Sequence, residues 1–399
     1  MNTAMMKGYV VLQVVPRLEA GGVERTTVDI AQAIVNDGGR ALVVAEPGLL
    51  VEELQQKGGV FFAMDAASKN PLKMLQTARS LKKMVLQQGV NLIHARSRAP
   101  AWPAFWAARA CNIPFVTTYH GVYSQKSAPK ALYNSVMARG DRVIANSQFT
   151  ADLISARHPF AREQLRIIYR GTDLDAFHPD AVLDKQIKAL AHDWQLSSED
   201  LSRPVILNVA RLTGWKGQVV LIEAVQKLLK AISSNALNKK PLLLLAGGSQ
   251  GDTSYEDSLR QMINERGLAD DIRLVGHCAD VPAALALANC AVVASIRQES
   301  FGRAAVEAEA FGVPVIVTDH GAAAETVLGP PQVDENQRTG WRVPPGDVDA
   351  LQEALTTVLS LPQLELLAIT KRAQCHARDN FSLTSMCRGT LDVYAELLD

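Results

Sequence analysis

Residues 298–318 read QESFGRAAVEAEAFGVPVIVT. The stretch opens with the carboxylate of Glu299, the next three residues can begin a helix, and a second carboxylate, Glu307, follows eight positions after the first. Gly312-Val313-Pro314 and an apolar run close it, so the pattern predicts a loop, a helix, a tight turn and a buried strand. The N–H groups at a helix N-terminus attract a phosphate. Carboxylates on both sides of such an anion can accept hydrogen bonds from a sugar and from a ribose.

A third carboxylate, Glu309, follows Glu307 by two residues. On a helix this spacing turns its side chain about 200° away from that of Glu307. We therefore interpret Glu309 as a solvated or structural residue rather than as part of the site.

Length and composition indicate a folded protein of two or three domains. The chain has 399 residues, of which 48% are hydrophobic and 21% are charged, as is typical of soluble globular proteins. No apolar run reaches the roughly 18 to 20 residues that span a bilayer, and residues 1–15 lack the layout of a signal peptide. The five cysteines are scattered, which predicts free thiols in a reducing compartment. We therefore expect a cytoplasmic protein.

The formal net charge of zero hides an asymmetry between the two halves of the chain. Residues 1–180 carry 21 Lys and Arg against 14 Asp and Glu, whereas residues 181–399 carry 20 against 27. No acidic residue lies between Asp65 and Asp141, a stretch that holds 11 cations. The N-terminal half is therefore expected to face an anionic partner.

Short apolar runs alternate with amphipathic stretches along the whole chain. This alternation predicts two doubly wound α/β domains, whose parallel sheets bind ligands beyond the carboxyl ends of their strands. The expected strands are 9–15, 41–45, 91–95, 115–119, 142–146 and 166–169 in the first series, and 205–209, 242–246, 272–275, 291–294 and 315–318 in the second.

With these motifs the chain resembles the retaining glycosyltransferases of the GT-B fold, in particular the large Glu-x7-Glu family, known as family 4 or group 1. Glu-Ser-Phe-Gly at 299–302 and Gly-Val-Pro-Val-Ile at 312–316 carry the resemblance, which spans nearly the whole chain. It implies transfer of a hexose from a nucleotide sugar with retention of configuration. Mannose or glucose is a family-level expectation, and nothing in the side chains selects the base.

The resemblance also implies the domain organisation. An acceptor-binding Rossmann-like domain is expected at 1–185 and a donor-binding one at 200–365, facing each other across a cleft. Helices at about 366–399 are expected to cross back onto the first domain.

Carried over residue by residue, the resemblance assigns roles within the opening stretch. Glu307 would hold the ribose, and the backbone of Ser300, Phe301 and Gly302 would meet the diphosphate. Glu299 would hold sugar hydroxyls, and it is not placed as a nucleophile. In this family the leaving phosphate is thought to accept the acceptor's proton after front-face attack.

Glycines and cations after two strands complete the expected diphosphate site. Gly21 and Gly22 follow the first strand and match the loop that meets the donor diphosphate in the family. Arg211 and Lys216 follow the first strand of the second series. A guanidinium fork and an ammonium point charge together can neutralise a leaving diphosphate.

Other strand ends supply the remaining candidates for donor binding. Gly248 follows one further strand of the second series, and Val275 and His277 end another, near which the resemblance implies nucleobase contacts made largely through backbone. His120 ends the strand 115–119, and the resemblance implies that it positions the donor sugar rather than acting as a base. His94 has weaker support, and we interpret it as a hydrogen-bonded core or rim histidine.

No metal or other cofactor is expected. The pairs Asp173/Asp175 and Asp347/Asp349 look like the Asp-x-Asp metal motif of the other glycosyltransferase fold, but that motif belongs to a single-domain architecture. No His, Cys and Asp cluster has the spacing of metal ligands. The nucleotide sugar is a substrate, and no nucleic-acid partner is expected.

Basic residues of the first half suit an anionic acceptor. Arg96, Arg98, Tyr123, Lys126 and Lys130 are expected on loops at the end that carries the site. Such a set suits an acceptor with phosphate or carboxylate, for example a lipopolysaccharide core or a lipid-linked saccharide of the cell envelope.

The basic stretch 69–88 predicts an amphipathic helix packed on the sheet. Its apolar side is expected to hold Leu72, Leu75, Ala78, Leu81 and Val85. Its cations lie mostly elsewhere, and we hypothesise that they hold the protein peripherally against anionic lipid on the inner face of a membrane.

Two other classes of function stay open from the sequence. A GT-B relative can act as a sugar-nucleotide epimerase or as a phosphorylase, and dependence on inorganic phosphate would identify the latter. A catalytically silent sugar-nucleotide-binding protein is the second class. The intact set of Glu299, Glu307, Arg211 and Lys216 argues against it.

Overall fold

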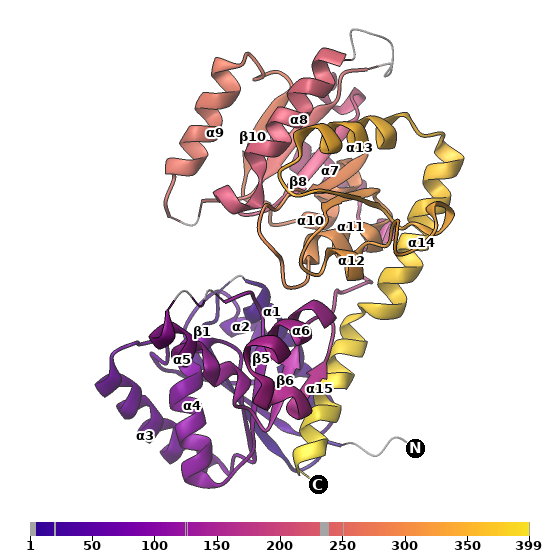
Figure 1. The fold of residues 1–399 in the computed structure, drawn as a ribbon. Helices are drawn as coiled ribbons and strands as arrows, with labels where there is room; N and C mark the ends of the chain where they lie inside the picture. Colours follow the sequence, from indigo (N-terminus) through magenta and orange to yellow (C-terminus); the bar gives the residue numbers. More distant parts are fainter. Residues whose placement is uncertain are drawn as a thin grey trace. The chain divides into compact units, whose positions relative to one another are not determined.

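The computed structural model describes residues 5–19, 21–123, 125, 127–231, 239–249 and 251–398. These residues form two compact units. Unit 1 comprises residues 1–171 and 383–399, and unit 2 comprises residues 172–382. Figure 1 follows the chain through both units, from indigo at the N-terminus to yellow at the C-terminus.

Unit 1 is built on a 7-stranded parallel sheet with the strand order β3-β2-β1-β4-β5-β6-β7. Apolar side chains alternate along the central strand β1, so that Leu12 and Val14 face one helical layer and Val11 and Val15 face the other. Both faces of the sheet are therefore buried, as expected for parallel strands. The strands are β1 (Val10–Arg17), β2 (Arg40–Glu46), β3 (Val60–Ala63), β4 (Leu92–Ala95), β5 (Phe115–Tyr119), β6 (Arg142–Ala145) and β7 (Leu165–Ile167).

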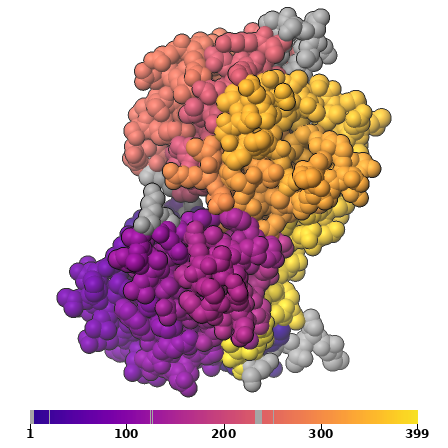
Figure 2. All heavy atoms as spheres, viewed as in Figure 1, coloured from indigo at the N-terminus to yellow at the C-terminus, as the bar shows by residue number. Residues whose placement is uncertain are grey.

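Helices cover both faces of this sheet. One layer contributes α3, α4 and α6 to the core, and the other contributes α1, α2 and α15. In Figures 1 and 2 the yellow C-terminal segment lies against the rest of unit 1, where α15 packs on α1. The helices are α1 (Gly22–Asn36), α2 (Val51–Gln56), α3 (Pro71–Gln88), α4 (Arg98–Cys111), α5 (Ala128–Ser135), α6 (Gln148–Arg157) and α15 (Leu383–Leu398).

Unit 2 repeats this architecture with a 6-stranded parallel sheet in the order β10-β9-β8-β11-β12-β13. Apolar clusters lie on both faces of its sheet as well. The strands are β8 (Val205–Val209), β9 (Leu242–Ala246), β10 (Ile272–Gly276), β11 (Cys290–Val293), β12 (Val315–Thr318) and β13 (Trp341–Val343). The helices are α7 (Asp184–Asp193), α8 (Gln218–Ala231), α9 (Ser254–Glu265), α10 (Val281–Leu287), α11 (Arg303–Phe311), α12 (Ala323–Thr326), α13 (Val348–Ser360) and α14 (Gln363–Asn380).

The units divide at different residues from those expected from the sequence. Residues 172–185 belong to unit 2, and so does the whole of α14, because α14 packs against α11. The return of the chain to unit 1 therefore begins at Leu383, not near residue 366. Two edge strands, β3 and β13, were also not predicted.

Candidate functional site

Two loops of unit 2 leave neighbouring strands where the strand order of the sheet reverses. β8 and β11 pair in parallel, so the loops that follow them leave the same edge of the sheet. Ligands of doubly wound sheets bind at such a reversal. The first loop carries Arg211 and Lys216, and the second carries Ser295 and Glu299.

Lys216 and Glu299 form an ion pair across these two loops. The ammonium nitrogen lies 2.8 Å from Oε1 of the carboxylate, and the two side chains are 15% and 19% exposed. The hydroxyl of Ser295 donates to the same carboxylate oxygen. The Trp215 ring lies 4.4 Å from the Lys216 ammonium and 6.0 Å from the Arg211 guanidinium carbon. The loops thus hold Lys216 against one fixed carboxylate, and Trp215 lies near both Lys216 and Arg211.

Two glycines allow these loops to pack closely. Gly217 has φ 74°, and a Cβ there would overlap the carbonyl oxygen of Ala294. Gly321 has φ 63°, and a Cβ there would overlap the backbone of Glu299. The N–H of Ala322 donates to the carbonyl of Glu299 at 3.1 Å. The backbone of residues 321–322 therefore packs directly on that of Glu299, which helps to fix the position of its carboxylate.

The helix predicted after Glu299 is α11, which has Gly302 as its N-cap residue. Gly302 has φ 95°, in the left-handed region that favours glycine. Phe301 is 3% exposed and meets the Phe381 ring edge-on at 5.4 Å, which anchors the start of the helix. No side chain within the described residues caps this N-terminus by a hydrogen bond. Uncapped helix N-termini are a common anion-binding arrangement.

Glu307 and Glu309 occupy different surroundings on α11. Glu307 is 7% exposed, and its carboxylate lies 2.9 Å from Nε of Arg303, one turn earlier. Glu309 is fully buried, so of the two expected roles, solvated or structural, the structural one applies. Burial raises the pKa of the Glu309 carboxyl well above its usual range.

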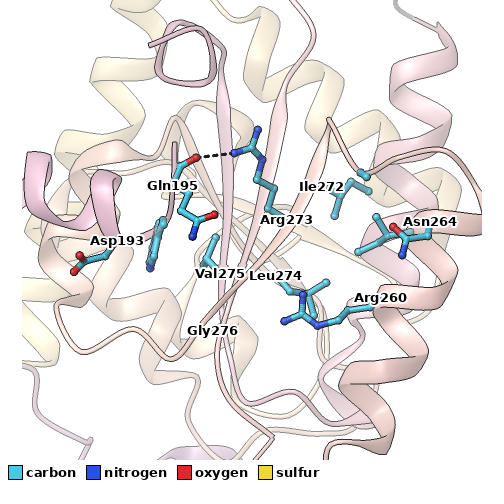
Figure 3. Close-up of a pocket in the computed structure, with 12 residues that line it drawn as sticks. Asp193, Gln195, Arg260, Asn264, Ile272, Arg273, Leu274, Val275 and Gly276 are labelled. Carbon is cyan, nitrogen blue, oxygen red and sulfur yellow. Dashed lines mark hydrogen bonds between the residues drawn. The ribbon is translucent and has the colours of Figure 1, made fainter. Parts of the chain in front are cut away.

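Three of the expected donor-binding residues lie at two strand ends. The carbonyl of Gly248 accepts from the N–H of Leu212 at 3.1 Å, Val275 lies on β10, and His277 is exposed just beyond it. A cavity of about 580 Å³ runs along β10, and Val275 lines it (Figure 3). Neither Glu299 nor its partner lysine is among the described residues that line this cavity.

The sequence reasoning did not single out the residues that support Glu299 from β11 and β12. The hydroxyl of Thr318 donates to the carbonyl of Ser295 at 2.6 Å, and Nε2 of His320 lies 2.8 Å from the same oxygen. A cavity of about 20 Å³ lies among these residues and Glu299. The only signal in the sequence was position, because Ser295 and Thr318 follow or end strands at the ligand-binding edge.

In unit 1, the loop after β1 leads to the N-terminus of α1. Gly21 is the N-cap of α1, and no side chain within the described residues caps this helix by a hydrogen bond. A Cβ at Gly22 would overlap the guanidinium of Arg170, whose Nη2 lies 3.5 Å from the hydroxyl of Thr26. The paired glycines therefore let a cation lie directly against the N-terminus of α1.

His120 follows β5 and lines a cavity of about 20 Å³ in unit 1, together with Arg96, Asn146 and Arg170. Burial, and then the charges of Arg170 and Arg96, lower the pKa of His120 well below its ordinary value. His120 is therefore neutral at pH 7. A neutral imidazole can donate or accept a hydrogen bond, which fits a positioning role.

Arg96 lies on the loop between β4 and α4, as expected, but its side chain is buried. It is 2% exposed, and its Nε donates to Oε1 of Gln13 at 2.6 Å. Burial lowers the pKa of its guanidinium. His94 is fully buried, with Nδ1 at 2.6 Å from the Tyr394 hydroxyl and Nε2 at 2.7 Å from the hydroxyl of Thr118. His94 is thus a hydrogen-bonded core histidine.

Of the other candidate acceptor residues, Arg98 and Tyr123 are in contact with each other. Arg98 is the first residue of α4, donates to Asn134 at 3.0 Å, and lies 4.2 Å above the ring of Tyr123. Arg98 is therefore not on a loop. Lys130 is exposed on α5. Lys126 lies outside the described residues.

The two Asp-x-Asp pairs have local structural roles. Oδ1 of Asp173 accepts from the N–H of Asp175 at 3.2 Å, and Asp347 caps α13 by accepting from the N–H of Ala350 at 2.9 Å. Asp349 pairs with Lys227. The described residues contain no group of three His, Cys, Asp or Glu that could hold a metal ion.

Within the described part of the chain, no helix is both long and apolar enough to cross a membrane.

Comparison with known proteins identifies the class to which this fold and site belong. The family described as glycosyl transferases group 1 matches residues 195–375, and glycosyltransferase family 4 matches residues 20–176. The crystal structure of a glycosyltransferase from Rickettsia africae is 31% identical, covers 98% of this chain and 99% of its own, and superposes with a TM-score of 0.86. The two Rossmann-like units have the GT-B fold. The chain belongs to the group 1, or family 4, glycosyltransferases.

Two further relatives extend the comparison. The D-inositol 3-phosphate glycosyltransferase 1 of Catenulispora acidiphila is 28% identical in the matched region. That region covers 59% of this chain and 58% of the relative's length. The crystal structure of Anabaena Alr3699/HepE in complex with UDP and glucose is 23% identical, covers 98% of this chain and 100% of its own, and has a TM-score of 0.79. This second likeness shows the shared fold.

Proposed function

We propose that this chain is a retaining hexosyltransferase that uses a nucleotide sugar as donor and an anionic cell-envelope glycan as acceptor. The observation that carries the proposal is the Lys216–Glu299 pair beside Arg211, at the strand reversal of unit 2 and next to the N-terminus of α11. Family membership supports the same activity.

Each side chain of the donor site then has a distinct task. Arg211, Lys216 and the first amides of α11 offset the charge of the diphosphate, which grows on the leaving group as the bond to the sugar breaks. Glu307 accepts hydrogen bonds from the ribose, and Glu299 accepts them from the hexose. On this basis unit 2 is the donor-binding unit, and the backbone near Gly248, Val275 and His277 holds the base.

The environment of Glu299 suits a hydrogen-bond acceptor better than a nucleophile. One of its oxygens already accepts from Lys216 and from Ser295, which lowers its nucleophilicity and fixes its direction. We therefore place no covalent intermediate on it. The acceptor oxygen bonds to the anomeric carbon on the face that the diphosphate leaves, the carbon–phosphate-oxygen bond breaks, and the departing phosphate oxygen takes the acceptor's proton.

Unit 1 supplies the acceptor side of the proposal. Positive charge dominates it between Asp65 and Asp141, and the basic residues Arg98 and Lys130 lie within that stretch. A lipopolysaccharide core or a lipid-linked saccharide carries the phosphate or carboxylate that such a surface selects. The Catenulispora relative is named for an anionic sugar alcohol, D-inositol 3-phosphate, which agrees with this class of acceptor.

We also propose that transfer needs no metal ion. Two cations and a helix N-terminus offer the diphosphate the positive charge that a divalent ion supplies elsewhere. Activity that survives EDTA would agree with this, and activity restored only by added Mg²⁺ or Mn²⁺ would contradict it.

The proposal is tested by incubating the chain with UDP-, GDP-, ADP- and dTDP-hexoses, with water as the acceptor. Release of nucleoside diphosphate and hexose is followed by proton NMR at early times, before the free sugar mutarotates. An α-linked donor that first releases the α-hexose shows retention, and the β-hexose contradicts it. Release that requires inorganic phosphate identifies a phosphorylase instead.

Lys216→Met is the control variant for this assay. Loss of one preorganised charged donor is expected to lower turnover by about 10²-fold or more. Nucleotide binding with no release by the wild type, under every donor, would favour the silent sugar-nucleotide-binding alternative.

A further inference from the structure

Helix α3 has a buried face that differs from the one expected from its sequence. Asn70 caps the helix by accepting from the N–H groups of Leu72 and Lys73, and Gly89 ends it with φ 65°. Leu72 and Leu75 are exposed, whereas the sequence had placed them on the apolar side. The buried face instead consists of Met74, Thr77, Ala78, Leu81 and Val85.

The face of α3 that points away from the sheet combines leucines with cations. Leu72, Leu75 and Leu86 are 73%, 44% and 68% exposed. Their spacing of 3 and then 11 residues keeps them on one stripe, because three turns of an α-helix take about 11 residues. The same stripe carries exposed Arg79, Lys82 and Lys83. We call these six residues the outer stripe of α3.

The charge of the outer stripe is not balanced nearby. The 18 residues of α3 include no Asp or Glu. Within the described residues, none of the three cations forms an ion pair. By contrast, α9 of the other unit carries Glu256 one turn before Arg260, and the two pair at 2.7 Å. Helix α9 therefore offsets its cation, and α3 does not.

The geometry points to the outer stripe of α3 as a docking surface for an anionic lipid bilayer. A helix that lies in the membrane interface presents leucines to the acyl boundary and basic residues to the headgroups. Its 18 residues extend over about 27 Å, so all six side chains can meet one flat surface together. The absence of acidic residues on the helix matches the negative surface potential of such a bilayer.

This inference goes beyond the proposed function, because it names where the chain binds and not what it transfers. It also separates two contributions. The cations should attract the chain to anionic lipid in a salt-sensitive way, and the leucines should add a contribution that salt does not weaken.

The test is co-sedimentation of the full chain with vesicles of phosphatidylcholine alone and of phosphatidylcholine with phosphatidylglycerol. Binding is expected to the anionic vesicles only. Neutralising two cations in Lys82→Gln/Lys83→Gln is expected to weaken that binding about 25-fold, since each cation near the surface contributes roughly fivefold. Raising the salt concentration should weaken the wild type more than this variant.

The leucines are tested by Leu72→Gln/Leu86→Gln, which is expected to weaken binding about 10-fold or more at every salt concentration. Leu364→Gln is the matched control, because Leu364 is 82% exposed on α14 of unit 2 and should leave binding unchanged. Donor hydrolysis without vesicles should be equal in all these variants and in the wild type, which keeps this test independent of the proposed function.

Equal binding to neutral and anionic vesicles would overturn the inference, and so would variants of the stripe that bind like the wild type. A dimer that dissociates in Leu72→Gln/Leu86→Gln, seen by light scattering, would assign the stripe to a second copy of the chain and would also overturn it. An unchanged melting temperature in each variant shows that lost binding does not reflect unfolding.

Discussion

Replacing Glu299 by Gln should strengthen the binding of a nucleoside diphosphate while it weakens transfer. Glu299 Oε1 lies 2.8 Å from the Lys216 ammonium, and less than a fifth of either side chain is exposed. At an effective dielectric constant of about 20, charges at this distance attract by about 6 kcal/mol, and desolvation offsets most of it. The Lys216–Glu299 ion pair is therefore expected to contribute a net free energy of about 1 kcal/mol.

The carboxylate of Glu299 competes with the nucleoside diphosphate for the Lys216 ammonium. In the free protein Lys216 points at Glu299, whereas the proposed diphosphate needs the same ammonium. Glu299→Gln removes the competing charge, so the nucleoside diphosphate should bind about fivefold more tightly. The amide still accepts from hexose hydroxyls but less strongly, and turnover should fall about 10²-fold. Lys216→Met should do the opposite to binding, because a hydrogen bond to a charged group contributes about 1.5–3 kcal/mol, or roughly 10- to 100-fold.

Isothermal titration calorimetry with the nucleoside diphosphate measures both affinities. Asp349→Asn serves as the control, because Asp349 forms an exposed ion pair with Lys227 in the same unit and should not affect binding. If Glu299→Gln weakened diphosphate binding as much as Lys216→Met, the two residues would support each other structurally. The reasoning about competition would then be refuted.

Three further predictions concern stability. Gly321→Ala places a side chain at φ 63° against the Glu299 backbone and should lower the free energy of unfolding by about 1–3 kcal/mol, measured in urea. Glu309→Met removes a buried carboxyl whose pKa is raised in the folded protein. Such a group destabilises the folded state as the pH rises above the pKa that it has in the unfolded chain. The variant should therefore be more stable than the wild type at about pH 8 and only slightly more stable at about pH 4.5. The pKa values of His94 and His120 are lowered in the folded protein, so below about pH 6.5 the unfolded chain binds more protons than the folded one. The free energy of unfolding should therefore fall by up to about 1.4 kcal/mol for each histidine and each pH unit as the pH decreases below about 6.5. His120→Asn should make this decrease less steep. An unchanged melting temperature in Gly321→Ala, a pH-independent gain in Glu309→Met, or an unaltered acid slope in His120→Asn would contradict the corresponding prediction.

The central strands could be predicted from the sequence to within a residue or two. β5, β8, β9 and β12 have the predicted bounds, because a strand buried on both faces is a continuous apolar run between polar residues. β3 and β13 were not predicted; they are only 4 and 3 residues long, which is too short to give a clear periodic pattern.

The candidate site was predictable where residues follow strands at the ligand-binding edge. Lys216 and Glu299 were each expected there, yet their mutual ion pair depends on how two loops 83 residues apart in sequence meet. Arg96 lies on a loop as expected, but its burial was not predicted. Its burial rests on Gln13, 83 residues earlier, and on a core that includes Tyr394. Contacts between distant segments leave no local pattern.

The local sequence of α3 also did not decide which of its faces is exposed. Leu72 and Leu75 match the helical periodicity of an apolar side as well as Met74 and Ala78 do. Only the direction in which the helix packs on the sheet decides which set is buried. From the sequence, only the cations of this helix were expected to face anionic lipid, and the structure adds the exposed leucines to that surface.

The central claim is that unit 2 binds the diphosphate of a nucleotide sugar through Lys216, Arg211 and α11. The most direct measurement is a thermal-shift titration of wild type and Lys216→Met with UDP, GDP, ADP and dTDP in EDTA. One nucleotide at about 100 times its Kd should stabilise the wild type by roughly 2.7 kcal/mol, and the shift should shrink in the variant. Equal shifts in both proteins, or no shift with any of the four nucleotides, would contradict the account.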